Sequence, residues 1–124
     1  MEVLQWPDPK AAVITYLSQR LDVGVHSRIP IERPASFVRV QLAGGAGVRD
    51  GLLSDVAFTV ESWDDDESEA QARAQRIRGL LKTAYTMGGH PVCGYHEWGP
   101  PVDLADTSRQ WRYTFTFAIR FRPI

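Results

Sequence analysis

Apolar side chains recur every three or four residues directly after the dipeptide Asp8-Pro9. This spacing is typical of a helix that buries one face. Asp8 is suited to cap the first turn because its carboxylate can accept hydrogen bonds from free backbone amides, and proline is favoured at the first helical position. The pattern therefore predicts a helix over residues 9–21, ended by the segment 22–24.

A second and stronger helical pattern follows three consecutive aspartates. Asp66 and Glu69 have the spacing of a capping box, and acidic residues in the first turn interact favourably with the helix dipole. Gly88 and Gly89 are expected to end this helix. Its apolar face comprises Ala70, Ala74, Ile77, Leu80, Leu81 and Ala84.

Alternating apolar and polar residues predict strands in much of the remaining chain. The last of these patterns is the strongest, because all its odd positions are large and apolar and should form a buried face. Glycines at 44, 45 and 47 predict a flexible polar loop over residues 44–50, which would join two antiparallel strands. The predicted strands are 25–29, 36–42, 53–63, 92–98 and 111–121.

The order of these elements predicts an α+β fold. The expected sheet is mostly antiparallel and has four to five strands, with two helices packed on one face. Phe115 and Phe117 should be buried under the second helix, against Ile77, Leu80 and Leu81. No internal repeat or linker divides the sequence, so residues 1–124 are expected to form one domain.

The composition narrows the classes of function. With 14 basic and 15 acidic residues the formal net charge is −1, so there is no global field to attract phosphates and no specific nucleic-acid partner is expected. The longest apolar runs are far shorter than the roughly 18 residues of a membrane span, and the N-terminus lacks a signal-peptide pattern. Cys93 is the single cysteine, so no internal disulfide is expected.

One local set of residues resembles metal ligands: His90, Cys93, His96 and Glu97. In a strand over residues 92–98, Cys93 and Glu97 would point to one face and His96 to the other. The set would therefore not meet around one ion, and ordinary strand and turn residues explain it better.

Three other patterns also have structural explanations. The aspartates at 64–66 suit capping of the second helix, the glycines at 44–47 do not precede a helix as a phosphate loop would, and the aromatic residues of 111–121 suit a core. The sequence thus predicts no catalytic residue, no metal ligand and no cofactor. We expect that the protein is not an enzyme.

Several phrases of the sequence, taken in order, resemble the tail terminator or tail-completion proteins of long-tailed bacteriophages and prophages. The resemblance covers nearly the whole chain and rests on short sequence segments and their order, not on a catalytic signature. The phrases are Trp6-Pro7-Asp8-Pro9, Val23-Gly24-Val25-His26-Ser27-Arg28-Ile29-Pro30, Arg33-Pro34-Ala35-Ser36-Phe37-Val38-Arg39-Val40, Val60-Glu61-Ser62-Trp63, Gly99-Pro100-Pro101-Val102-Asp103-Leu104 and Arg112-Tyr113-Thr114-Phe115-Thr116-Phe117.

The resemblance implies a structural protein that closes into a homohexameric ring, caps the tail tube and ends its polymerisation. Its implied partners are further copies of itself, the major tail tube protein and the head-tail connector. Its implied place is the head-proximal end of the virion tail, after assembly in the host cytoplasm. Three alternatives remain: a head-tail joining (neck) adaptor of similar size, a cellular binding or adaptor module without catalysis, and a small metal-dependent hydrolase. The hydrolase would require bound zinc or magnesium and would lose activity on changing His90, His96 or Asp66.

The uneven charge distribution suggests an interface for such a ring. An acidic cluster at 61–69 on one subunit would approach a basic set near the C-terminus of its neighbour, although two solvated faces would explain the same pattern. The segment 44–53 is expected to be mobile and to order on the tail tube. The candidate interface residues are Arg49, Leu52, Leu53, Glu61, Asp64, Asp65, Asp66, Arg109, Arg112 and Arg120.

Overall fold

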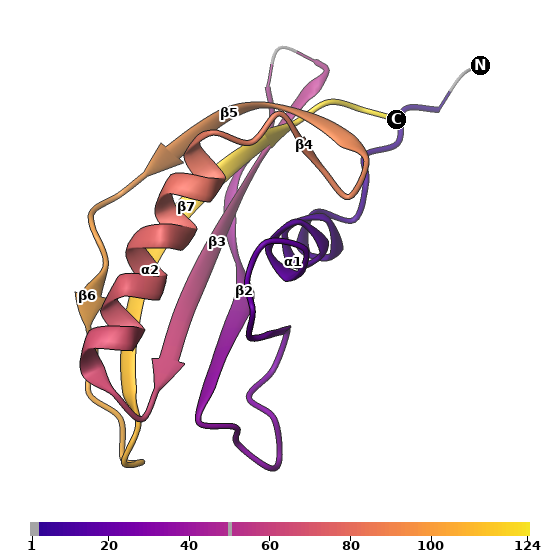
Figure 1. The fold of residues 1–124 in the computed structure, drawn as a ribbon. Helices are drawn as coiled ribbons and strands as arrows, with labels where there is room; N and C mark the ends of the chain where they lie inside the picture. Colours follow the sequence, from indigo (N-terminus) through magenta and orange to yellow (C-terminus); the bar gives the residue numbers. More distant parts are fainter. Residues whose placement is uncertain (1–2, 50) are drawn as a thin grey trace.

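The computed structural model describes residues 3–49 and 51–124 (Figure 1). In these residues one mixed sheet has the strand order β1-β2-β3-β7-β5-β4, and β6 also pairs with β7. The helices are α1 (Pro9–Ser18) and α2 (Glu67–Lys82). The strands are β1 (Gly24–His26), β2 (Ser36–Arg49), β3 (Leu53–Asp64), β4 (Thr86–Met87), β5 (His90–Glu97), β6 (Val102–Asp103) and β7 (Trp111–Phe121).

The α+β class is confirmed, but the sheet is larger than predicted and is mixed. The prediction of four to five strands missed β4 and β6, because a strand of two residues is too short to show an alternating pattern. The prediction of a mostly antiparallel sheet missed one pair: β1 runs parallel to β2, with Gly24 opposite Phe37. Both helices pack on the same face of the sheet (Figure 1), as expected.

The core lies between this face and the two helices. The prediction that Phe115 and Phe117 are buried is confirmed, and they share one cluster with Ile77 and Leu81 of α2. The prediction that every odd position of β7 is buried is wrong for Trp111, which is 41% exposed, and for Tyr113, which is only partly buried. The Tyr113 hydroxyl donates to the carboxylate of Glu67, the first residue of α2, so Trp111 lies beyond the start of the helix and is left uncovered.

The helix starts form as the sequence predicts. The Asp8 carboxylate accepts a hydrogen bond from the Ala11 amide, and Asp66 accepts from the amides of Ser68 and Glu69. Both helices end earlier than predicted: α1 ends at Ser18 and not at residue 21, and α2 ends at Lys82, before Gly88 and Gly89. The hydroxyl of Tyr16 donates to the Leu80 carbonyl at 2.7 Å and so links the two helices. Neither helix of the described residues is long and apolar enough to cross a membrane.

The glycine-rich segment is a strand, and the prediction of a loop over residues 44–50 is wrong for 44–49. Strand β2 continues to Arg49 and pairs with β3, with register shifts on either side of Gly44. Such shifts are β-bulges, in which glycine adopts the positive φ that other residues avoid. We refer to residues 41–49 of β2 as the arm. A strand built from glycine and alanine has no alternating side chains, so its sequence resembles that of a loop.

Gly45 provides a test of this conformation. It has a φ of +114°, and a Cβ atom there would lie 2.5 Å from the Asp55 carbonyl oxygen. Gly44 has a φ of +90° but nothing within 4 Å. We expect Gly44→Ala to cost about 1 to 2 kcal/mol of stability through backbone strain alone. Gly45→Ala should cost about 1 to 3 kcal/mol more because of the steric clash.

Urea denaturation of the two variants measures this difference, and hydrogen exchange at the β3 amides opposite the arm locates it. Equal denaturation midpoints for the two variants would show that the arm does not lie against β3 in solution.

Candidate interaction surfaces

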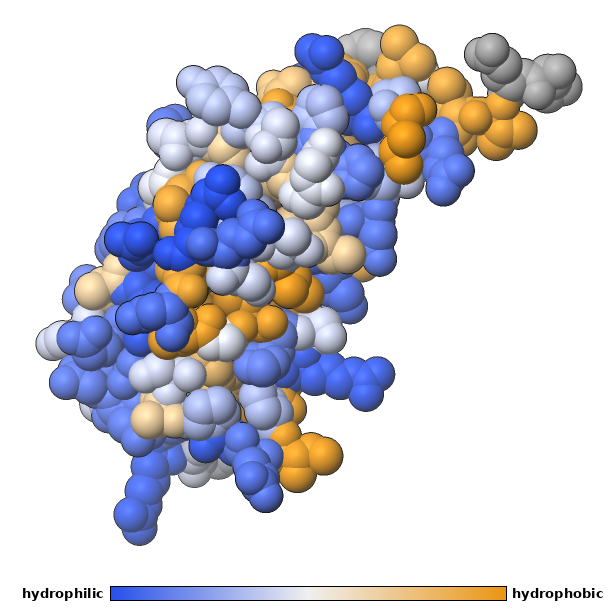
Figure 2. Space-filling model, turned by 45° about the vertical axis from the view of Figure 1, so that its right-hand side comes forward, coloured by the Kyte–Doolittle hydropathy of each residue, from blue (hydrophilic) through white to orange (hydrophobic). Residues whose placement is uncertain are grey.

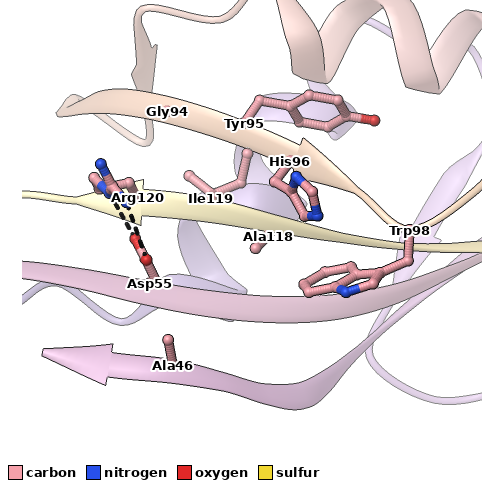
Figure 3. Close-up of a pocket in the computed structure, with 9 residues that line it drawn as sticks. All are labelled: Ala46, Asp55, Gly94, Tyr95, His96, Trp98, Ala118, Ile119 and Arg120. Atoms are coloured by element: carbon pink, nitrogen blue, oxygen red, sulfur yellow. Dashed lines mark hydrogen bonds and ion pairs between the residues drawn. The ribbon is translucent and has the colours of Figure 1, made fainter. Parts of the chain in front are cut away.

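The face of the sheet opposite the helices, here called the open face, carries a groove. The groove has a volume of about 400 Å³ and is lined from four strands, β2, β3, β5 and β7 (Figure 3). Small side chains such as Ala46 and Ala118 leave room at its floor, and His96 and Trp98 lie edge to face at one rim with ring centroids 4.8 Å apart. Trp98 is 59% exposed, so this rim presents an apolar ring to solvent.

An ion pair occupies the other end of the groove. The Arg120 guanidinium donates from Nε to Asp55 Oδ1 at 2.7 Å and from Nη2 to Oδ2 at 3.2 Å (Figure 3). A bidentate pair of this kind fixes both side chains. Arg120, a candidate for the interface between subunits, is therefore engaged within its own subunit.

A second network on the open face surrounds Glu61. Its carboxylate accepts hydrogen bonds from Arg39 and, at 3.4 Å, from Arg112, and its side chain is only 5% exposed. Arg112 also donates to the carbonyl oxygens of Leu104 and Ala105. This buried carboxylate thus joins β2, β3 and β7 and holds the loop before β7 in place.

The ring of Trp63 lies beside this network and is fully buried. Phe37 stacks on it at 5.5 Å, and the guanidinium groups of Arg33 and Arg112 lie 5.2 and 5.0 Å from its centroid. Two loops meet there: Gln110 Nε2 donates to the Pro34 carbonyl at 2.7 Å. The open face is therefore covered at this end, which we call the loop end.

Asp64 links the sheet to α2. Its carboxylate accepts hydrogen bonds from Arg73 at 2.8 Å, from the Ser36 hydroxyl at 2.7 Å and from the backbone amide of Asp66 at 2.8 Å. Burial raises the pKa of Asp64, but these hydrogen bonds together outweigh burial and lower it below its ordinary value. The charged carboxylate of Asp64 is therefore bonded to partners within its own subunit.

Strand β5 is tied to α2 by a further ion pair. Arg78 Nε donates to both oxygens of Glu97 at 2.9 Å, and the Tyr95 hydroxyl donates to Glu97 Oε2 at 2.6 Å. The hydrogen bonds from Arg78, and then from Tyr95, lower the pKa of Glu97 to about 2. Burial, followed by the bond to Glu97, raises the pKa of the Tyr95 hydroxyl. In the described residues no group of three His, Cys, Asp or Glu side chains is placed to hold a metal ion.

The structure divides the candidate interface residues into two groups. The residues of the first group form ion pairs within the subunit. Among them, Glu61 pairs with Arg112, although the two were expected on opposite sides of a contact between subunits. The second group is exposed in whole or part, while the side chain of Arg49 lies outside the described residues. The first group is Glu61, Asp64, Arg112 and Arg120; the second is Leu52, Leu53, Asp65, Asp66 and Arg109.

Exposed apolar side chains gather at the end of the molecule that holds the arm and both chain termini (Figures 1 and 2). Trp6 Nε1 donates to the Leu52 carbonyl at 2.8 Å, and the Ile124 amide donates to the Gln5 carbonyl, so three distant segments meet there. Sequence reasoning identified only the hairpin part of this surface. We call it the apolar end; its exposed residues are Val3, Leu4, Val48, Leu52 and Ile124.

The sequence matches no family model, and it matches none of the curated proteins. One solved structure with a similar fold is a chain from the virion of a native gene transfer agent (GTA) particle, with a TM-score of 0.68 and 17% sequence identity. The match covers 91% of this chain and 93% of the other. This protein therefore has the same fold as that virion chain over nearly the whole length of both.

Proposed function

We propose that this protein is a structural subunit of a phage-like virion and not an enzyme. The observation that carries the proposal is the shared fold with a chain of a gene transfer agent particle, at a TM-score of 0.68 over 91% of this chain. The resemblance of its sequence to proteins of long-tailed phages supports the same class of function independently. A fold can serve several functions, so the experiment below tests the role directly.

Within such a virion, the proposed role is that of a tail terminator. The subunit closes into a homohexameric ring at the head-proximal end of the tail, ends polymerisation of the tail tube and meets the head-tail connector. The apolar end supports this role, because exposed Val48 and Leu52 are costly in water unless they dock on a partner. No cofactor is needed for any of these contacts.

Deletion of the gene from the element that encodes it should give tails of uncontrolled length, visible by electron microscopy, and a plasmid copy should restore normal length. Leu52→Glu should fail to restore it, because a charge would prevent apolar docking. Tyr85→Glu is the matched control, since Tyr85 is 86% exposed and belongs to no part of the apolar end.

The same deletion separates the alternatives. Tails of normal length that do not join heads would replace the proposed role with that of a head-tail joining adaptor. Normal, complete particles would reject a virion role and favour a cellular adaptor.

A further inference from the structure

In the part of the chain that the structure describes, each side of the sheet has a stretch of strand that no further strand pairs with. Strand β4 pairs with β5 at His90 and Pro91, and the Val92 amide donates to the Tyr85 carbonyl, so the outer edge of β5 is open over residues 93–97. Strand β1 pairs with β2 only through residues 37–39, so the arm is open in the same way. Backbone N–H and C=O groups along such edges are ready to pair with another strand.

The two open stretches lie at the same height across the sheet. The pairing of β5 with β7, β7 with β3 and β3 with β2 defines rows of residues that lie side by side across the sheet. One such row joins the first part of the β5 stretch to the last part of the arm, and a second row joins the opposite ends. A copy of the subunit placed alongside, without a shift along the strands, therefore brings one open edge level with the other. The two rows are Gly94–Arg120–Asp55–Gly47 and Glu97–Phe117–Phe58–Leu42.

The strand directions are also compatible. Strands β2, β3, β7 and β5 are each antiparallel to the next, so β5 runs opposite to β2. If a second copy keeps the same orientation, its β2 arm is antiparallel to β5 of the first copy. The antiparallel alternation of the sheet then continues across the boundary without interruption.

We propose that residues 93–97 of one copy pair antiparallel with the arm of the next copy. The contact uses two different edges, so it is heterologous and closes into a ring when the rotation between copies is regular. The arm is suited to this contact, because its glycines and alanines let a neighbouring strand approach and its bulges allow the sheet to bend. This inference deepens the proposed function, since it rests on the ring and specifies how its subunits join.

The single cysteine of the chain allows a direct test. Cys93 is exposed and lies in the open stretch of β5. Neighbouring strands place opposite Cα atoms about 4.5 to 5.5 Å apart, within the range that a disulfide spans. A second cysteine would be introduced along the arm of the otherwise unchanged protein, one position at a time, followed by mild oxidation and non-reducing electrophoresis. The positions are Gln41, Ala43, Ala46 and Val48.

Head-to-tail pairing should produce a ladder of covalent oligomers, because every subunit then carries one cysteine on each edge. One arm position should cross-link most strongly and thereby report the register. Each variant in a Cys93→Ser background should lose the ladder. Arg109→Cys is the matched control, since Arg109 is exposed but lies at the loop end.

Cross-linking from no arm position above the level of Arg109→Cys, in variants whose thermal unfolding matches that of the parent, would overturn the inference. Cross-linking is measured on the purified protein up to about 1 mM, so that even a weak contact is populated. Overlong tails after gene deletion combined with no ladder would retain the tail terminator and assign its ring to another surface. A ladder combined with normal tails would retain the strand pairing and reject the terminator.

Discussion

Replacing Phe117 with alanine is expected to lower the free energy of unfolding by about 3 to 5 kcal/mol. Phe117 is completely buried in the central strand β7, and its ring stacks on Phe58 at 5.2 Å and on Tyr95 at 6.1 Å. Removing it leaves a cavity at the point where three strands and α2 share one core. For a domain of this size such a loss is a large part of the total stability.

Urea denaturation of the purified variant, followed by circular dichroism, measures this loss. Tyr85→Ala is the control, because Tyr85 is 86% exposed and its removal should change stability by no more than about 0.5 kcal/mol. A Phe117→Ala variant with the denaturation midpoint of the parent would contradict the burial of this ring.

Replacing Glu61 with alanine is the second change with a large expected effect, a loss of about 3 to 5 kcal/mol. Its carboxylate neutralises Arg39 and Arg112, whose side chains are only 18% and 16% exposed. Without it, two guanidinium groups remain close together with little access to water. The loop before β7 should also loosen, since Arg112 donates to the carbonyls of Leu104 and Ala105.

The control for this change is Glu32→Ala, because Glu32 is exposed on a loop. Both variants are compared by thermal unfolding and by hydrogen exchange in residues 104–112. Unchanged stability and exchange in Glu61→Ala would show that the buried network does not hold the loop. Glu61→Gln is a milder variant of intermediate stability, which allows the measurement if Glu61→Ala fails to fold.

The Glu61 network also determines which charge reversal can test contacts between subunits. Arg112→Glu would place two carboxylates side by side within one subunit, so it would report on folding. Arg109 is exposed, and its reversal leaves the buried networks intact. The expected acidic-to-basic contact between subunits thus remains a prediction for the exposed residues Asp65, Asp66 and Arg109, and not for the buried pairs.

The sequence predicted those elements that are long enough to show a period. Helix α2 and strand β7 were evident because each presents several successive apolar residues to the core. The arm was missed because glycine and alanine carry no alternating pattern, and β4 and β6 are two residues each. The burial of Glu61 was missed because its partners Arg39 and Arg112 come from strands that meet it only in the folded sheet.

The position of β7 has a consequence for the newly made chain. This strand is the last along the described sequence, yet it lies in the middle of the sheet between β3 and β5. While the chain emerges from the ribosome, those two strands therefore lack their common partner, and their apolar surface and unpaired backbone groups are exposed to water. The sheet can close only after Trp111–Phe121 has left the exit tunnel. A chaperone that binds the nascent chain would therefore be most useful just before synthesis of that strand is complete.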